Sequence, residues 1–153
     1  MNIESFPLDF ERDYPIAQEW ANNWWKDSDG DSENYLKKDI LPTDGAITYI
    51  DNTPAVVSFQ YFPYNSKVCF MAFLISNPSI RDKSMSAAID SNLEKSRELF
   101  KEKGFLIQTV ITHNKAIEKH LTKNGYHDGG NTELLYLQHN SNDQLLAFHT
   151  DER

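Results

Sequence analysis

The sequence has one cysteine, a deficit of positive charge and no long apolar run. Cys69 has no cysteine to pair with inside the chain, and it lies in the apolar run KVCFMAFLI, so we expect a small buried residue. The net charge of −8 argues against nucleic-acid binding, which requires clustered Lys and Arg. No stretch approaches the length of a membrane span, and the N-terminus lacks the basic start and apolar core of a signal peptide. We therefore expect a cytoplasmic protein with neither nucleic acid nor membrane as a partner.

The composition predicts one folded unit. A chain of 153 residues with 39% hydrophobic and 12% aromatic content is suited to one domain with a core of ordinary size. We assign residues 1–138 to that domain and residues 139–153 to a polar C-terminal tail. The tail has an apolar patch at residues 145–148 that can dock on the domain or on a partner, which leaves a homodimer open.

A helix is predicted near the N-terminus. Asp13 is expected to cap it, and Pro15 is tolerated in its first turn. Trp20 and Trp24 recur at helical spacing on the core-facing side, whereas Trp25 points elsewhere and can line a cleft. The helix is expected to end at about residue 26, before a polar loop and a short helix at about residues 35–40.

The remaining elements alternate in type. Strands are predicted at residues 45–50, 54–62 and 67–75 as an antiparallel meander, and the third of these is apolar on both faces, as in a strand covered on both sides. A helix over residues 83–103, a strand at 106–112, a helix at 115–124 and a strand at 133–137 follow. The fold class is therefore mixed α/β, with a mixed sheet whose parallel pairing is made by a crossover helix.

One loop resembles the cofactor loop of a known family. Residues 77–89 read NPSIRDKSMSAAI, in which Pro78, Arg81 and the small residues before Ile89 match the register of the phosphate loop of GNAT acyltransferases. The positions that are glycine in the family hold three other residues, Asp82, Ser84 and Ser86. Backbone N–H groups at a helix N-terminus hold the phosphates in such a loop, and every non-proline residue has one. The loop is therefore expected to bind CoA more weakly than a glycine loop; alternatively, Asp82 or Ser84 only caps the helix.

A second match lies in the late strand and helix. Val110, Asn114, Gly125 and Tyr126 have the spacing of the corresponding GNAT motif, whereas the family's usual tyrosine acid falls on Leu121. The paired tryptophans and the stretches TPAVVSFQY and ISNP are also similar to a divergent bacterial and phage subgroup in which the glycine loop is commonly eroded. The resemblance covers roughly residues 3–137.

The resemblance implies a GNAT fold, an antiparallel meander followed by β-α-β-α-β, and an N-acetyltransferase that moves an acetyl group from acetyl-CoA to an amine of a small molecule or protein. A catalytically inactive GNAT-fold binding or regulatory protein is the alternative. The implied cofactor-binding residues are Leu74, Ile75, Ser76, Arg81, Asp82, Lys83, Ser84, Met85, Ser86 and Asn114. Among these, the backbone N–H groups near residues 74–76 are expected to polarise the thioester carbonyl.

The candidate proton-transfer groups are His113 as base and Tyr126 as acid. His113 directly precedes Asn114 and has a side-chain pKa suited to proton transfer near neutrality, although a solvent-facing role is equally compatible with its position. With leucine in the usual acid position, Tyr126, Tyr61 or a water is able to protonate the thiolate, or no acid is required.

The acceptor amine is expected to bind near the segment between the first two helices. Residues 27–33 read DSDGDSE, and the resemblance implies that they border the acceptor site, where Asp29 and Asp31 would attract a cation. The segment lacks the Gly and Glu of a calcium loop, so no metal site is expected, and a solvated loop is the simpler interpretation. Trp25 and Tyr61 complete the predicted substrate residues.

Overall fold

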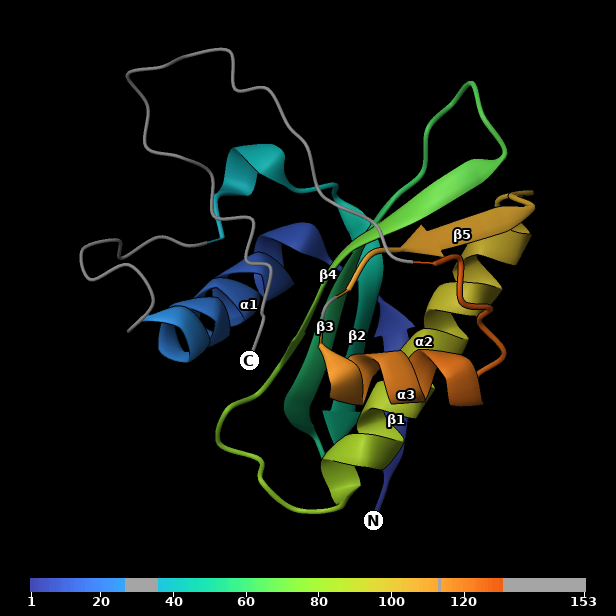
Figure 1. Cartoon of the computed structure of the whole chain (residues 1–153). Helices are drawn as coiled ribbons and strands as arrows, with labels where there is room; N and C mark the ends of the chain where they lie inside the picture. Colours follow the sequence, from blue (N-terminus) through green and yellow to red (C-terminus); the bar gives the residue numbers. More distant parts are fainter. Residues whose placement is uncertain (27–35, 113, 131–153) are drawn as a thin grey trace.

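A five-stranded sheet in the order β1-β2-β3-β4-β5 organises the chain (Figure 1). The computed structural model describes residues 1–26, 36–112 and 114–130. The strands are β1 (Ile3–Pro7), β2 (Asp44–Ile50), β3 (Thr53–Tyr61), β4 (Val68–Ser76) and β5 (Ile107–Val110). The helices are α1 (Phe10–Trp25), α2 (Ser84–Glu102) and α3 (Lys115–Lys123), with a short 3-10 helix η1 (Lys38–Ile40). Strands β1 to β4 pair antiparallel and β5 joins β4 in parallel, which confirms the predicted mixed α/β fold class.

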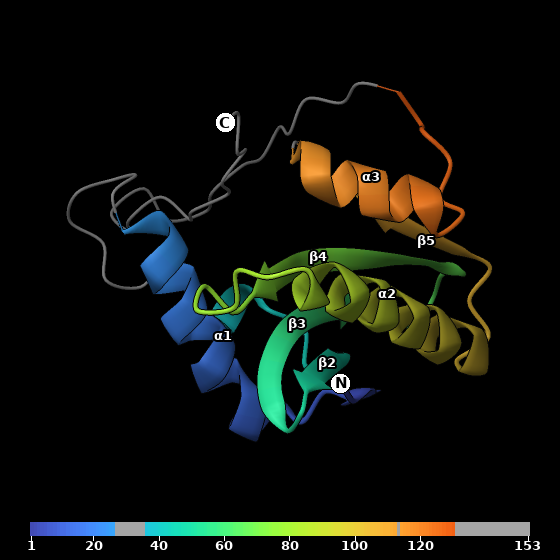
Figure 2. The same cartoon turned by 90° about the horizontal axis from the view of Figure 1, so that it is seen from below.

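The helices cover both faces of the sheet (Figure 2). Helix α1 packs on one face, where Trp20 and Ala17 lie in a buried cluster with Phe59. Helix α2 packs on the other face, where Leu93 lies in a second cluster that also includes Leu121 of α3. Helix α2 is the crossover between β4 and β5, so it places its own N-terminus beside the end of β4.

The start of α1 differs from the prediction. Asp9, not Asp13, is the N-cap, and its side chain accepts a hydrogen bond from the Arg12 amide. Asp13 is fully buried, and its carboxylate is satisfied there by hydrogen bonds from the Asp9 amide (2.9 Å) and the Arg12 guanidinium (2.7 Å). Pro15 consequently lies inside the helix rather than in its first turn. The preceding strand β1 is also absent from the prediction; its Ser5 hydroxyl hydrogen-bonds to the hydroxyls of Thr48 and Ser91.

A bulge and an early strand end open the sheet between β4 and β5. Phe73 lies opposite Phe59 and Met71 opposite Gln60, so Ala72 is an extra residue in β4. Strand β5 follows β4 only as far as the pair Met71 and Val110. Within the described part of the chain, no strand pairs with residues 72–76 on the side away from β3. The prediction that β4 is covered on both faces is wrong at Phe70, whose exposed fraction is 44%.

Helix α3 is attached to α2 by a polar cluster around Asp90. The Asp90 carboxylate accepts hydrogen bonds from Lys123 Nζ (2.7 Å), His120 Nδ1 (2.9 Å) and Asn124 Nδ2 (2.9 Å). Partial burial of Asp90 raises the pKa of its carboxyl, but these three hydrogen bonds outweigh burial and leave the pKa below its ordinary value. The cluster therefore stabilises the position of α3 against α2 while Asp90 is ionised.

The predicted C-terminal ends of α2 and α3 are confirmed. Gly104 and Gly125 have φ angles of +81° and +90°, as expected for glycines that terminate helices. The predicted strand at residues 133–137, the tail at 139–153 and the acidic segment at residues 27–33 lie outside the described residues. Among the residues that the structure describes, no helix has the length and apolar character of a membrane span.

Candidate active site

The open edge of β4 provides backbone hydrogen-bonding groups. The Asn77 amide donates to a carbonyl of β3 (2.8 Å), which fixes the direction of the residues before it. Backbone groups of successive residues in an antiparallel pair point to alternate sides. The N–H and C=O groups of Ser76 and Leu74 therefore point into the opening, whereas those of Ile75 point toward β3. Of the three residues predicted to polarise a carbonyl, Leu74 and Ser76 have suitably directed donors.

The loop from β4 to α2 is held by its own side chains. The side-chain Nδ2 of Asn77 donates to the Pro54 carbonyl (2.9 Å), and its side-chain Oδ1 accepts from the backbone N–H of Ser79 (2.9 Å). Among the described non-glycine residues, only Asp51 and Asn52 have a positive φ angle, and they form the turn between β2 and β3. The loop backbone thus adopts its conformation without glycine.

Asp82 occupies the N-terminus of α2. Its carboxylate accepts hydrogen bonds from the Ser84 amide (2.8 Å) and from the Ser84 hydroxyl. The hydrogen bonds from the Ser84 hydroxyl and then from the Ser84 amide lower the pKa of the Asp82 carboxyl. Lys83 is the N-cap residue of α2 and makes no side-chain capping bond, so Asp82 caps the helix from the residue before it. Its carboxylate lies on the Ser84 amide, the first amide of α2. Met85 packs against the buried cluster under α2, whereas Ser86 and Lys83 are exposed.

Arg81 and Trp24 connect the loop to α1. The Arg81 guanidinium lies 5.3 Å from the centroid of the Trp24 ring, and its Nε donates to the Pro78 carbonyl (2.8 Å). The Trp24 indole N–H donates to the Ser76 carbonyl (2.8 Å), one of the groups that point into the opening. Trp24 therefore lies at the mouth of the open edge, and the structure brings Ser76 and Arg81 together through it.

Two of the three tryptophans are placed differently from the prediction. Trp20 is buried, but Trp24 is 39% exposed and contacts the site. Trp25 packs against the buried cluster under α1, because it lies four residues after Ala21 on the face that is buried. Helical spacing alone did not identify Trp24, since its partner is a backbone carbonyl and leaves no mark in the sequence.

The structure describes two further predicted site residues, Asn114 and Tyr61. Asn114 caps α3, and its side-chain oxygen accepts from the amides of Ala116 (2.9 Å) and Ile117 (3.1 Å). Tyr61 is opposite Phe70, six residues before Ser76, which is about 20 Å along a strand. His113, Asp29 and Asp31 lie outside the described residues.

Tyr126 ends a chain of hydrogen-bonded polar side chains that runs into the core to the buried Ser96 and Gln60. Its hydroxyl donates to the Gln108 side-chain oxygen, Gln108 donates to the Ser96 hydroxyl (2.8 Å), and that hydroxyl donates to the Gln60 side chain (2.9 Å). Burial raises the pKa of Tyr126 to about 12, so the phenol retains its proton at neutral pH. Leu121, at the family's acid position, is buried in the core beside α2 and has no ionisable group.

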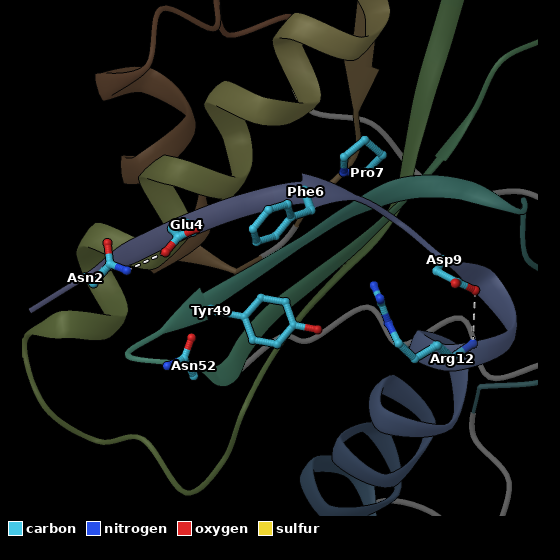
Figure 3. Close-up of a pocket in the computed structure, with 8 residues that line it drawn as sticks. All are labelled: Asn2, Glu4, Phe6, Pro7, Asp9, Arg12, Tyr49 and Asn52. Atoms are coloured by element: carbon cyan, nitrogen blue, oxygen red, sulfur yellow. Dashed lines mark hydrogen bonds between the residues drawn. The ribbon is translucent and has the colours of Figure 1, made fainter.

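A separate cavity lies at the opposite edge of the sheet (Figure 3). It has a volume of about 400 Å³, and Phe6 and Tyr49 form part of its wall in an edge-to-face contact. Glu4, Asp9 and Arg12 line it as well. None of the residues predicted from the sequence lies in this cavity, and its position at β1 separates it from the β4 opening by the width of the sheet.

Comparison with solved structures identifies the fold. The aminoglycoside acetyltransferase meta-AAC0020 from an uncultured soil metagenomic sample, in complex with sisomicin, superposes with a TM-score of 0.64 at 9% identity, over 89% of this chain and 95% of that one. The ribosomal-protein-alanine N-acetyltransferase of Brucella melitensis biovar Abortus 2308 superposes with a TM-score of 0.63 at 9% identity, over 90% and 100% of the two chains. The aminoglycoside N-acetyltransferase AAC(6')-Iy in complex with CoA gives 0.59 at 13% identity, over 90% and 95%.

The chain therefore has the fold of the GNAT acetyltransferases, as the two sequence motifs implied. No family model matches the sequence, and no curated protein matches it either. The likeness thus lies in the arrangement of the elements rather than in the sequence, as expected at identities of 9–13%.

Proposed function

We propose that the protein is an N-acetyltransferase that transfers an acetyl group from acetyl-CoA to an amine. The observation that carries this proposal is the opened edge of β4, where the N–H groups of Leu74 and Ser76 point away from β3 beside the N-terminus of α2. The similar enzyme AAC(6')-Iy has been solved in complex with CoA and with the bisubstrate analogue CoA-S-monomethyl-acetylneamine.

Residues of this chain fit CoA in part. The unpaired edge of β4 suits an extended ligand with amide groups, because it offers donors and an acceptor in the pattern of a neighbouring strand. Arg81 and the first amides of α2 suit phosphate oxygens. Asp82 opposes them, since its carboxylate is hydrogen-bonded to Ser84 at the place where an anion would bind. We expect binding that is weaker than a glycine loop would give.

The transfer requires a new C–N bond, breakage of the thioester C–S bond, and movement of a proton from the amine. Acetyl-CoA supplies the activated acetyl group. The Leu74 and Ser76 amides are placed to stabilise negative charge on the carbonyl oxygen. His113 remains the candidate base. The candidate acid Tyr126 is protonated, with its hydroxyl on Gln108, so a water is an equally suitable proton donor.

Calorimetric titration with acetyl-CoA tests the cofactor assignment. Arg81→Glu reverses one charge in the loop and should weaken binding at least several-fold. Lys101→Glu is the matched control: it makes the same charge change near the other end of α2, about 25 Å from Ser84, and should leave the affinity unaltered. Equal affinities of Arg81→Glu and wild type would exclude the loop from the cofactor site. Absence of binding at millimolar acetyl-CoA would indicate a GNAT-fold protein without the enzyme's chemistry.

A further inference from the structure

Trp24 has two contacts that tie different parts of the candidate site together. Its indole N–H is fixed on the Ser76 carbonyl (2.8 Å), at the open edge of β4. Its ring face is occupied by the Arg81 guanidinium, at 5.3 Å from the centroid. The side chain is nonetheless 39% exposed, so its ring is in reach of a ligand from solvent.

A tryptophan ring attracts cations through its quadrupole, more strongly than the rings of tyrosine and phenylalanine do. The Arg81 contact demonstrates that this particular ring accepts a planar cation. The contact is made at the surface, where a cation–π interaction is weak, while a bidentate hydrogen bond from a guanidinium to a phosphate is considerably stronger. A phosphate bound at the loop would therefore draw Arg81 away from the ring.

We propose that Trp24 is a binding residue for the cationic group of the acceptor, and that Arg81 fills its place until the cofactor binds. This inference rests on the proposed function. When CoA binds, the Arg81 guanidinium hydrogen-bonds to its pyrophosphate and leaves the Trp24 ring. The free ring face then binds a cationic group of the acceptor. The bond from Trp24 to Ser76 holds the ring beside the open edge of β4, close to the amides that stabilise the reacting carbonyl.

The chemistry also restricts the class of acceptor. The amine that attacks the thioester must be neutral, because a protonated amine has no lone pair to donate. The cation on Trp24 is therefore a second group of the same molecule. A polyamine or another compound with two or more basic groups satisfies both requirements, whereas a simple monoamine satisfies one of them.

The test measures binding of spermidine by calorimetry, with and without saturating CoA, which lacks an acetyl group and permits no turnover. In the wild type, CoA should strengthen spermidine binding by about five-fold, of the order expected for one cation–π contact. Trp24→Leu should lose most of this gain. Arg81→Gln, which leaves the ring free, should bind spermidine without CoA nearly as well as the wild type does with it. Tyr64→Leu is the control, because it removes an aromatic side chain that is 99% exposed in the turn between β3 and β4.

Trp24→Phe separates the ring from the hydrogen bond, since it keeps an aromatic face and loses the N–H donor to Ser76. Trp24→Phe should retain more of the CoA-dependent increase in spermidine affinity than Trp24→Leu does. If Trp24→Leu does not fold, Trp24→Phe takes its place in the test. An equal gain in the wild type and in both Trp24 variants would overturn the inference, because it would reflect only the charge of CoA itself. CoA titrated alone into the wild type reports on the proposed function separately; if CoA does not bind, both proposals fail.

Discussion

Replacement of Gly45 by alanine should destabilise the sheet strongly. Gly45 lies in β2 opposite Phe59 of β3, and its carbonyl accepts from the Leu8 amide (2.9 Å). A β-carbon at this position would overlap the carbonyl oxygen of Ser58, and it would lie 3.0 Å from the Ser58 carbonyl carbon and 3.1 Å from Phe59 Cα. These are backbone atoms of a central strand, so no side-chain rotation relieves the contact.

The magnitude follows from the kind of atoms that collide. Overpacking of a core costs about 1–3 kcal/mol where side chains can move aside, so a collision between two backbones should reach at least the upper end, about 3 kcal/mol. For a chain of this size that corresponds to a fall in Tm of about 6–12 °C. Urea unfolding should show a lower midpoint with an unchanged slope, as expected when stability changes and the denatured state does not.

Gly129→Ala is the control for this substitution. A β-carbon at Gly129 meets no atom within 4 Å, and the residue has no positive φ angle. Its stability should stay within about 0.5 kcal/mol of the wild type. If Gly45→Ala unfolded at the same urea concentration as Gly129→Ala, the close approach of β2 and β3 at this position would be refuted.

Other changes test the loop, α3 and the proton-transfer candidates. Asp82→Asn keeps a hydrogen-bonding cap on Ser84 and removes the charge, so calorimetry should detect tighter acetyl-CoA binding by a few-fold; weaker binding would contradict the opposing role of the carboxylate. Asp90→Asn should destabilise the protein by about 1 kcal/mol at pH 7. Because the pKa of Asp90 is lower in the folded protein than in the unfolded chain, its stabilising effect is complete above the unfolded pKa and is lost as the pH falls through the folded pKa. The difference in stability between Asp90→Asn and the wild type should therefore vanish in acid. The folded pKa of Tyr126 is about 12, above the ordinary 10, so its contribution to stability should be complete below pH 10 and should fall by about 2 kcal/mol as the pH rises to 12. Urea unfolding of Tyr126→Phe should not show this fall. If His113 is the base, His113→Ala should remove the acidic limb of the pH–rate profile, and an unaltered limb would exclude it.

The elements that could be predicted are those whose ends are marked by residues within the element or next to it. Gly104 and Gly125 end helices at the expected positions, and the turn at Asp51 and Asn52 has the positive φ angles that these residue types tolerate. Strand β1 was missed because its identity depends on pairing with β2, more than forty residues later, as in the pair of Ile3 with Ile50. A five-residue edge strand with two polar residues has little pattern of its own.

The candidate site was predictable where it depends on sequence register and not where it depends on backbone geometry. The position of Arg81 in the loop pointed to the contact region between the loop and the end of β4. The extra residue Ala72, which marks the bulge in β4, resembles its neighbours and carries no signal. Trp24 was assigned to the core because it follows Trp20 by four residues, yet its hydrogen bond to a carbonyl of β4 keeps it at the surface.

The missing glycines of the loop separate two roles that glycine plays in phosphate sites. One role is to permit a positive φ angle, and the other is to let a ligand approach the backbone closely. The loop and the first turn of α2 have no positive φ angle, so this backbone does not need glycine for its conformation. The second role, close approach of the ligand to the backbone, is the one that the missing glycines affect. Serine is small and adds a hydrogen-bond donor, so bulk is a minor obstacle. The main obstacle is the negative charge of Asp82, whose carboxylate lies on the Ser84 amide. The affinity for an anion should therefore depend more on Asp82 than on the absence of glycine from the positions of Ser84 and Ser86.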